Sequence, residues 1–115
     1  MNNEASTKVF IEGAELVSEN AGDGINRAVI AYDDRLMLVK VSFEQGSIGA
    51  LHQHPHSQIC YIEKGIFEVN IDDQKRILRQ GDSFYVAPGL LHGVHCLEAG
   101  VLIDMFSPMR EDFIR

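Results

Sequence analysis

Three histidines and one glutamine in this sequence have the residue types and the spacing to hold a metal ion. His52 and His54 lie two residues apart, Gln58 follows four residues later, and His92 comes after a Pro-Gly turn. On an extended strand, side chains two residues apart project to the same face, with Cα atoms about 6.5 Å apart. Gln58 has the parity of the two histidines, so it can return to their face.

The donor types determine which ion this set would take. Three imidazoles and one amide oxygen suit a borderline divalent transition metal, such as Zn, Ni or Fe, rather than Mg or Ca. A His-X-His pair alone is more often two solvated or core histidines than a metal site. The glycine-bounded segment around the pair, the polar residue of matching parity and the third histidine together favour the metal site.

The elements that must position these residues are short strands. Alternating or β-branched runs recur between Gly, Asp and Pro breaks, with no long helical pattern and no internal repeat. Turns are expected at 72–74 and 81–82. The predicted strands are Lys8–Ile11, Asn26–Tyr32, Leu36–Phe43, Gln58–Glu63, Ile66–Ile71, Lys75–Arg79, Ser83–Val86, His92–Leu97 and Val101–Phe106. This many short strands predict an all-β sandwich or barrel.

Length and composition fit one globular domain. The chain has 115 residues, of which 45% are hydrophobic, enough for one core but too few for two. We therefore expect a single domain over residues 1–115, with a polar N-terminal arm at 1–7. The C-terminal tail at 109–115 could hold a helical turn or lie as an arm.

Charge and hydropathy argue against two classes of partner. The net charge is −7 and there is no Lys/Arg cluster, so neither nucleic acid nor an anionic membrane is expected as a partner. No apolar stretch approaches the roughly 20 residues that span a bilayer, and no secretory signal is visible. Cys60 and Cys96 each lie in a strand-like run; we expect two buried reduced thiols, with a disulfide as the alternative. A cytoplasmic location is predicted.

The residues around the histidines resemble the two motifs of the cupin superfamily. Residues 46–65 follow the first motif, Gly, five residues, His-X-His, three or four residues, an acid, six residues, Gly, with Gln58 where most cupins have Glu. Residues 81–92 follow the second motif with Ala87 in place of a proline, and Cys96 replaces the trailing Asn. The resemblance implies a double-stranded β-helix, or jelly-roll barrel, and says less about the reaction.

A finer resemblance covers roughly residues 36–114. The His-Pro-His-X-Gln segment and residues 104–112 are similar to the small pectin-degradation cupins of the KdgF type. Those are dimeric, metal-containing enzymes that convert 4,5-unsaturated uronate monosaccharides from pectin or alginate breakdown into linear 4-deoxy-5-keto uronates. The resemblance implies a divalent transition metal (Ni, Zn, Fe or Mn) and no organic cofactor. By position, its ligands would be His52, His54, Gln58 and His92.

The same resemblance implies an active-site role for Asp104, Phe106 and Arg110. Asp104 would shuttle protons during ring opening and ketonisation, and Arg110 would hold the uronate carboxylate. Phe106 would offer an apolar wall to the sugar ring. Each residue has a structural alternative: an ion pair or an outward position for Asp104, a solvated tail position for Arg110, and plain core packing for Phe106.

Other functions and partners stay open at this point. The same scaffold would suit another metal-dependent enzyme, such as a dioxygenase or isomerase, or a non-catalytic sugar-binding module. His56 is expected at the pocket rim or in no role rather than as a ligand, and His95 is expected to face away from His92. A homodimer is expected, and the run Lys8–Ile11 is a candidate for exchange between subunits.

Overall fold

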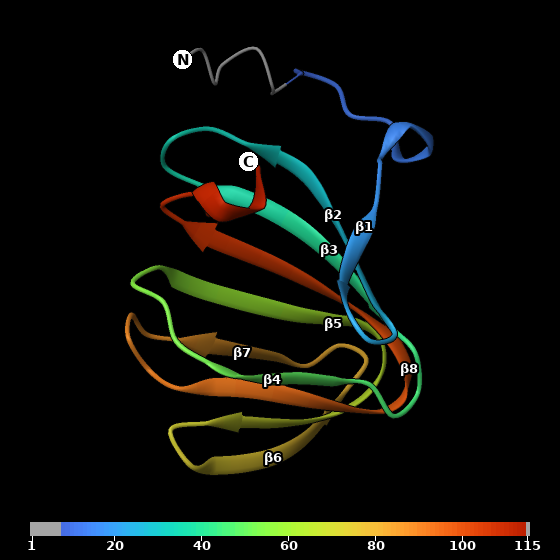
Figure 1. The fold of residues 1–115 in the computed structure, drawn as a ribbon, viewed down its shortest axis with the longest axis vertical. Helices are drawn as coiled ribbons and strands as arrows, with labels where there is room; N and C mark the ends of the chain where they lie inside the picture. The colour runs from blue at the N-terminus through green and yellow to red at the C-terminus, as the bar shows by residue number, and fades with distance from the viewer. Residues whose placement is uncertain (1–7, 115) are drawn as a thin grey trace.

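The strands of this chain form one antiparallel sheet that folds over on itself. The computed structural model describes residues 8–114, and Figure 1 shows the long strands β5 and β8 linking an upper and a lower group of strands. The order along the sheet is β1-β2-β3-β8-β5-β6, with β4 beside β8 and β7 beside β5. The elements are β1 (Glu19–Gly22), β2 (Ile25–Tyr32), β3 (Met37–Phe43), β4 (Ile48–His52), β5 (Ser57–Ile71), β6 (Gln74–Arg79), β7 (Ser83–Val86) and β8 (His92–Ser107), with single 3₁₀ turns η2 (Gly13–Glu15) and η3 (Glu111–Phe113).

The all-β prediction is confirmed, and residues 8–114 contain no α-helix. Within this part of the chain no helix is long and apolar enough to span a membrane. The turn expected at 72–74 is a two-residue turn in which Asp72 and Asp73 both have positive φ, so Gln74 already belongs to β6. The turn at Gly81 and the helical turn in the C-terminal tail, η3, are also present.

The long strands β5 and β8 each join two runs that the sequence predicts as separate strands. Their pairing shifts register between Ile62 and Phe67, where Gly65 lies against Gly100. Gly65 has a φ of 92°, and a Cβ added there would lie 2.6 Å from the carbonyl oxygen of Glu98. The glycines therefore allow the two paired strands to approach closely at this shift, where the sequence pattern suggested that each strand ends.

The predicted N-terminal strand Lys8–Ile11 is wrong. These residues form no strand, and Val9 and Phe10 are 88% and 85% exposed. The sheet edge beside β2 is occupied instead by β1, a polar segment that lacks the β-branched pattern of a strand. Strand formation depends on an available partner edge as well as on residue type. The arm predicted at 1–7 lies outside the described residues.

Two apolar clusters lie between the layers of the sheet. One contains Phe43, Ile62, Phe67 and both cysteines, and the other contains Met37, Val39 and Phe106. Cys60 and Cys96 are fully buried and free, which confirms the prediction of buried reduced thiols. The two clusters form the packed core that supports the polar side chains around the histidines.

Candidate metal site and pocket

Strand pairing brings the three histidines together from distant parts of the sequence. His52, the last residue of β4, pairs with His92, the first residue of β8. His54 follows in a non-strand segment, where its carbonyl oxygen accepts a 2.8 Å hydrogen bond from the backbone N–H of Gly89 in the Pro-Gly turn. The expectation that His52 and His54 share one extended strand is wrong, because β4 ends at His52 and a turn follows.

The ring nitrogens of these histidines converge. One nitrogen from each of His52, His54 and His92 lies within 4.8 Å of the other two. His54 and His92 are buried and His52 is exposed, so the cluster has one open side. Ring centroids are 4.3 Å apart for His52 and His92 and 4.8 Å apart for His54 and His92. This triad could hold a metal ion.

The hydrogen bonds of the imidazoles fit a metal-binding role. Nδ1 of His52 donates to the carbonyl oxygen of Ala50, and Nδ1 of His92 donates to that of Leu90, each at 2.9 Å. A carbonyl can only accept, so both rings carry their proton on Nδ1 and leave the Nε2 lone pair free. Nε2 of His92 is buried without a hydrogen-bond partner. Buried polar atoms without partners are rare, and a bound ion would satisfy this one.

Burial also favours the neutral form that a metal requires. Burial lowers the pKa of His92 to about 4, against the opposing effect of its hydrogen bond to Leu90. Burial lowers the pKa of His54 as well, and the hydrogen bond to Gln58 opposes the shift. Neutral imidazoles are therefore present at neutral pH, ready to donate lone pairs.

Gln58 lies between the histidine cluster and a buried carboxyl group. Its Oε1 lies 3.0 Å from Nε2 of His54, and its Nε2 donates a 2.9 Å hydrogen bond to Oδ1 of Asp104. The register explains the contact: Gln58 is opposite Phe106, and Cys60 is opposite Asp104, across the pair β5–β8. Residues two apart share a face, so all four side chains point inward.

Asp104 is a buried acid, 8% exposed. Burial raises the pKa of its carboxyl group, while hydrogen bonds from Cys60 and Gln58 and the positive charge of Arg110 oppose the shift. The outward-facing alternative for Asp104 is therefore excluded. A carboxyl group in this environment can exist in either protonation state closer to neutral pH than a solvated aspartate.

The C-terminal tail returns to the pocket with Arg110. Its Nε and Nη2 donate to the two carboxylate oxygens of Asp112, at 3.1 and 2.9 Å. The guanidinium carbon is 4.2 Å from the ring centroid of Phe113 and 5.1 Å from that of Phe106. The side chain of Arg110 is 12% exposed, so it is not a solvated tail residue. Phe106 belongs to the core and also lines the pocket.

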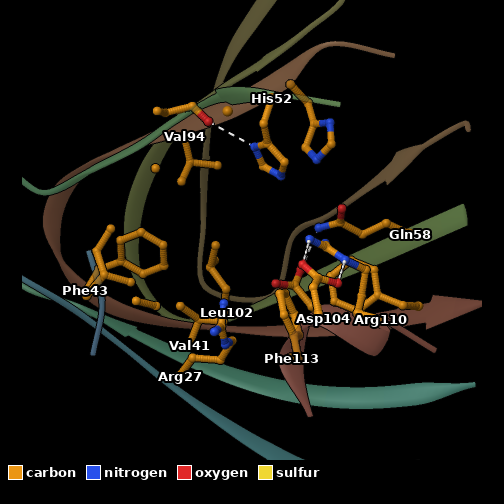
Figure 2. Close-up of a pocket in the computed structure, with 18 of the residues that line it drawn as sticks. Arg27, Val41, Phe43, His52, Gln58, Val94, Leu102, Asp104, Arg110 and Phe113 are labelled. Carbon is orange, nitrogen blue, oxygen red and sulfur yellow. Dashed lines mark hydrogen bonds and ion pairs between the residues drawn. The ribbon is translucent and has the colours of Figure 1, made fainter. Parts of the chain in front are cut away.

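These groups surround a pocket of about 330 Å³, at the lower end of the range for small-molecule sites. In Figure 2, His52 faces the cavity from one side, and Gln58, Asp104 and Arg110 gather on another. Phe43 and Leu102 form part of an apolar end. Of the predicted ligands and active-site residues, His52, Gln58, His92, Asp104, Phe106 and Arg110 all line this pocket. Their roles remain predictions.

Arg27 and Phe113 also line the pocket, and sequence reasoning did not identify them. Arg27 is two residues from Ile25, a core residue of the same strand, so both side chains lie on the inward face. A charged residue at an inward position of a predicted strand could have indicated a pocket residue. Phe113 had no signal, since the position of a tail after the last strand does not follow from any periodicity.

His56 and His95 both lie outside the converging triad. The ring of His56 is 5.3 Å from that of His54, and its buried Nδ1 has no hydrogen-bond partner. It does not belong to the converging triad. His95 lies away from the triad, in a groove on the outside of the barrel beside Ile48 and Glu68.

Comparison with known proteins agrees with this architecture. A family model described as a cupin domain matches residues 39–106. The pectin degradation protein KdgF of Dickeya dadantii (strain 3937) is 50% identical over 98 residues, which cover 84% of this chain and 89% of that protein. The chain belongs to the cupin superfamily, among the small pectin-degradation cupins of the KdgF type.

Two solved structures are similar over nearly the whole chain. An RmlC-like cupin from Shewanella frigidimarina NCIMB 400 superimposes with a TM-score of 0.90 and 42% identity, covering 93% of this chain and 96% of the other. KdgF from Halomonas sp. gives a TM-score of 0.88 and 38% identity, covering 93% and 99% of the two chains. The jelly-roll fold predicted from the motifs is thereby confirmed.

Proposed function

We propose that this protein is a metal-dependent enzyme that opens 4,5-unsaturated uronate monosaccharides, from pectin or alginate breakdown, to linear 4-deoxy-5-keto uronates. One observation carries the proposal: His52 and His92 of the histidine triad, Gln58 and the buried carboxyl group of Asp104 line a single sugar-sized pocket. Gln58 links the third histidine of the triad, His54, to Asp104. The similarity to proteins named KdgF, one of them a pectin degradation protein, supports the choice of substrate.

The reaction is an isomerisation, so no other reactant is needed. A proton leaves the anomeric hydroxyl, the bond from the anomeric carbon to the ring oxygen breaks, and its electron pair stays on that oxygen, so an aldehyde and an enolate form. The enolate becomes a ketone when its carbon takes up the proton. We assign both transfers to Asp104, which lines the pocket and can accept the first proton and return it in the second step.

Other residues of the pocket would bind and orient the sugar. Arg110, beside Asp104, would attract the uronate carboxylate with the donor groups that Asp112 leaves free. Phe106 would pack against the sugar ring and, with the apolar end of the pocket, exclude water from the enolate.

A divalent transition metal (Ni, Zn, Fe or Mn) is proposed at His52, His54, Gln58 and His92. Bound there, it would supply Lewis-acid polarisation of a sugar oxygen. All four donors are neutral, so the ligands would leave the full double charge of the ion available to an anionic substrate. The usual cupin glutamate would cancel part of that charge.

An assay with unsaturated galacturonate tests the proposal. Loss of the ultraviolet absorbance of the 4,5-double bond should be faster with the metal-loaded enzyme than in its absence. Asp104→Asn should abolish the acceleration, whereas Asp73→Asn, in an exposed turn, should retain it. No acceleration over the spontaneous reaction would reject the proposed function.

Two alternative functions predict different results when oxygen consumption and uronate binding are measured on the same protein. Oxygen consumption that depends on Fe would indicate a dioxygenase at the same histidine triad. Tight binding of the uronate without conversion would indicate a non-catalytic sugar-binding module. A cytoplasmic location, which agrees with two free buried thiols, is part of the proposal.

We also propose a homodimer that forms through the outer face of the sheet. Ile59 pairs with Tyr85 on one side and Met105 on the other, and these side chains are 47%, 58% and 42% exposed. Neighbouring exposed apolar side chains of this kind are typical of protein interfaces. Sedimentation should show a dimer, and Met105→Lys should shift it to a monomer; a monomeric wild-type protein would contradict this.

A further inference from the structure

Arg27 reaches the pocket from β2, an element that supplies none of the proposed metal ligands or active-site residues. Its guanidinium carbon lies 3.8 Å from the ring centroid of Phe113, and its side chain is 21% exposed. In Figure 2, Arg27 and Phe113 lie on the side of the pocket away from His52. The strand that holds Arg27 is paired with β3 at Val41, so its position is fixed by the barrel.

Arg27 and Arg110 both contact the aromatic ring of Phe113. Arg110 lies 4.2 Å from the centroid of Phe113, against 3.8 Å for Arg27, and both residues line the pocket. Two positive charges so close repel each other, and the aromatic ring offsets this only in part. The carboxylates that contact them, Glu19 and Asp112, have side chains that are 57% and 62% exposed. Exposed ion pairs of this kind are weak, so the two guanidinium groups keep part of their attraction for an anion.

The hydrogen-bonding capacity of Arg27 is largely unused. Within residues 8–114 its Nε is buried without a partner, and its ion pair is a 3.8 Å contact with the exposed Glu19. Arg110 differs, because its Nε and one terminal nitrogen are already bound by Asp112. A buried guanidinium nitrogen without a partner is costly, and an anionic ligand would remove the cost.

We propose that Arg27 is the second cation of a carboxylate subsite and that, together with Arg110, it makes the pocket select uronic acids over neutral sugars. The inference rests on the proposed function, which supplies the sugar acid as ligand. A carboxylate can receive two parallel hydrogen bonds from one guanidinium, which lysine cannot provide. Arg27 is thus a specificity-determining residue, and the proton transfers are left to Asp104.

A binding experiment that needs no turnover tests this inference. Galacturonate and galactose differ in the carboxylate, and calorimetric titration of the metal-loaded protein with each sugar gives an acid preference as a ratio of dissociation constants. The wild type should prefer galacturonate by about tenfold or more, as expected for a charge-assisted hydrogen-bonded pair. Arg27→Gln should lower the ratio towards one, with any remaining preference supplied by Arg110.

Two variants keep the result interpretable. Arg76→Gln, on the exposed strand β6, makes the same charge change outside the pocket and should keep the preference. Arg27→Lys keeps the positive charge and the aliphatic part of the side chain but loses the two parallel N–H donors of the guanidinium group. Its preference for galacturonate over galactose should therefore fall between those of the wild type and Arg27→Gln. If Arg27→Gln fails to fold, a wild-type preference in Arg27→Lys overturns the inference and a reduced one supports it.

The inference and the proposed function fail in different ways. Conversion of the unsaturated uronate, with an unchanged acid preference and KM in Arg27→Gln, would overturn the role of Arg27 alone. An acid preference that depends on Arg27, without any conversion, would reject the enzyme and keep the subsite. In an active enzyme, Arg27→Gln should raise KM for the uronate about tenfold or more while kcat changes little.

Discussion

Gln58 donates a hydrogen bond from its side-chain amide to the buried carboxyl group of Asp104, with 2.9 Å between Nε2 and Oδ1. At its other end, the amide oxygen lies 3.0 Å from Nε2 of His54. Only a side chain with both a donor and an acceptor can make these two contacts, and an ionised glutamate has no donor. The structure thus gives a physical reason for glutamine at a position where most cupins have glutamate.

Gln58→Glu should therefore destabilise the metal-free protein. The change replaces a donor by a carboxylate beside the buried Asp104, so two acids would face each other. We expect a loss of about 1–3 kcal/mol in the free energy of unfolding at neutral pH, the cost of a lost buried hydrogen bond. Chemical denaturation of the metal-free protein, monitored by circular dichroism, measures it.

The double variant Gln58→Glu/Asp104→Asn is the control for that prediction. The second substitution puts an amide at position 104 that can donate to the new carboxylate, so most of the lost stability should return. If the double variant is no more stable than the sum of the single changes predicts, the contact between Gln58 and Asp104 does not explain the effect.

Removal of the metal should lower the melting temperature of the protein, because an ion that binds only the folded state stabilises it by mass action.

His92→Asn should weaken metal affinity by more than about 100-fold. This loss is larger than the one expected when a residue that only hydrogen-bonds to a metal ligand is removed. His95→Asn is the matched control, on the same strand but outside the triad. Titration calorimetry and elemental analysis give the affinities and the stoichiometry; equal affinities in the two variants would contradict the site.

The ion pair in the C-terminal tail should give a small acid-dependent contribution to stability. The hydrogen bond from Arg110 lowers the pKa of Asp112 in the folded protein below its ordinary value of 3.8. The stabilisation is then present above pH 3.8 and lost as the pH falls through the lowered pKa. Asp112 is exposed, so Asp112→Asn should cost at most about 1 kcal/mol at neutral pH.

Unfolding measured from neutral pH to well below 3.8 checks this. The difference in stability between Asp112→Asn and the wild type should shrink towards zero in acid. A difference that stays constant over the whole range would show that the variant acts through something other than the charge of Asp112.

Both cysteines should resist alkylation in the native protein. Burial raises the pKa of the Cys60 thiol, followed in effect by the neighbouring charge of Asp104, and burial also raises that of Cys96. Since the thiolate is the reactive form, little of it exists at neutral pH, and both side chains are closed to reagents. Mass spectrometry after iodoacetamide treatment should show modification only after unfolding; rapid native labelling of Cys60 would contradict its place in the core.

The sequence predicted the fold and most of the pocket because both follow from short-range signals. The alternation in β5 put Gln58 and Cys60 on one face, and the alternation in β8 did the same for Asp104 and Phe106. The two cupin-like motifs then linked His52 to His92 across about forty residues, which periodicity alone could not do.

What the sequence did not predict depends on contacts between distant segments. Gly65 and Gly100 looked like strand breaks because their role in the close pairing of β5 and β8 exists only once the two strands meet. Phe113 becomes a pocket residue only because the tail folds back towards Arg27. The run Lys8–Ile11 has the composition of a strand but pairs with no strand in residues 8–114.

The place of β8 in the sheet has a consequence for synthesis. Residues 92–107 pair with β3, β4 and β5, so this late segment is the common neighbour of three earlier strands (Figure 1). A nascent chain still lacking it has no central strand and lacks His92, the third member of the histidine triad. We expect the ribosome-bound polypeptide to stay unstructured until that segment emerges, and then to fold cooperatively, at the slow rate typical of non-local pairing.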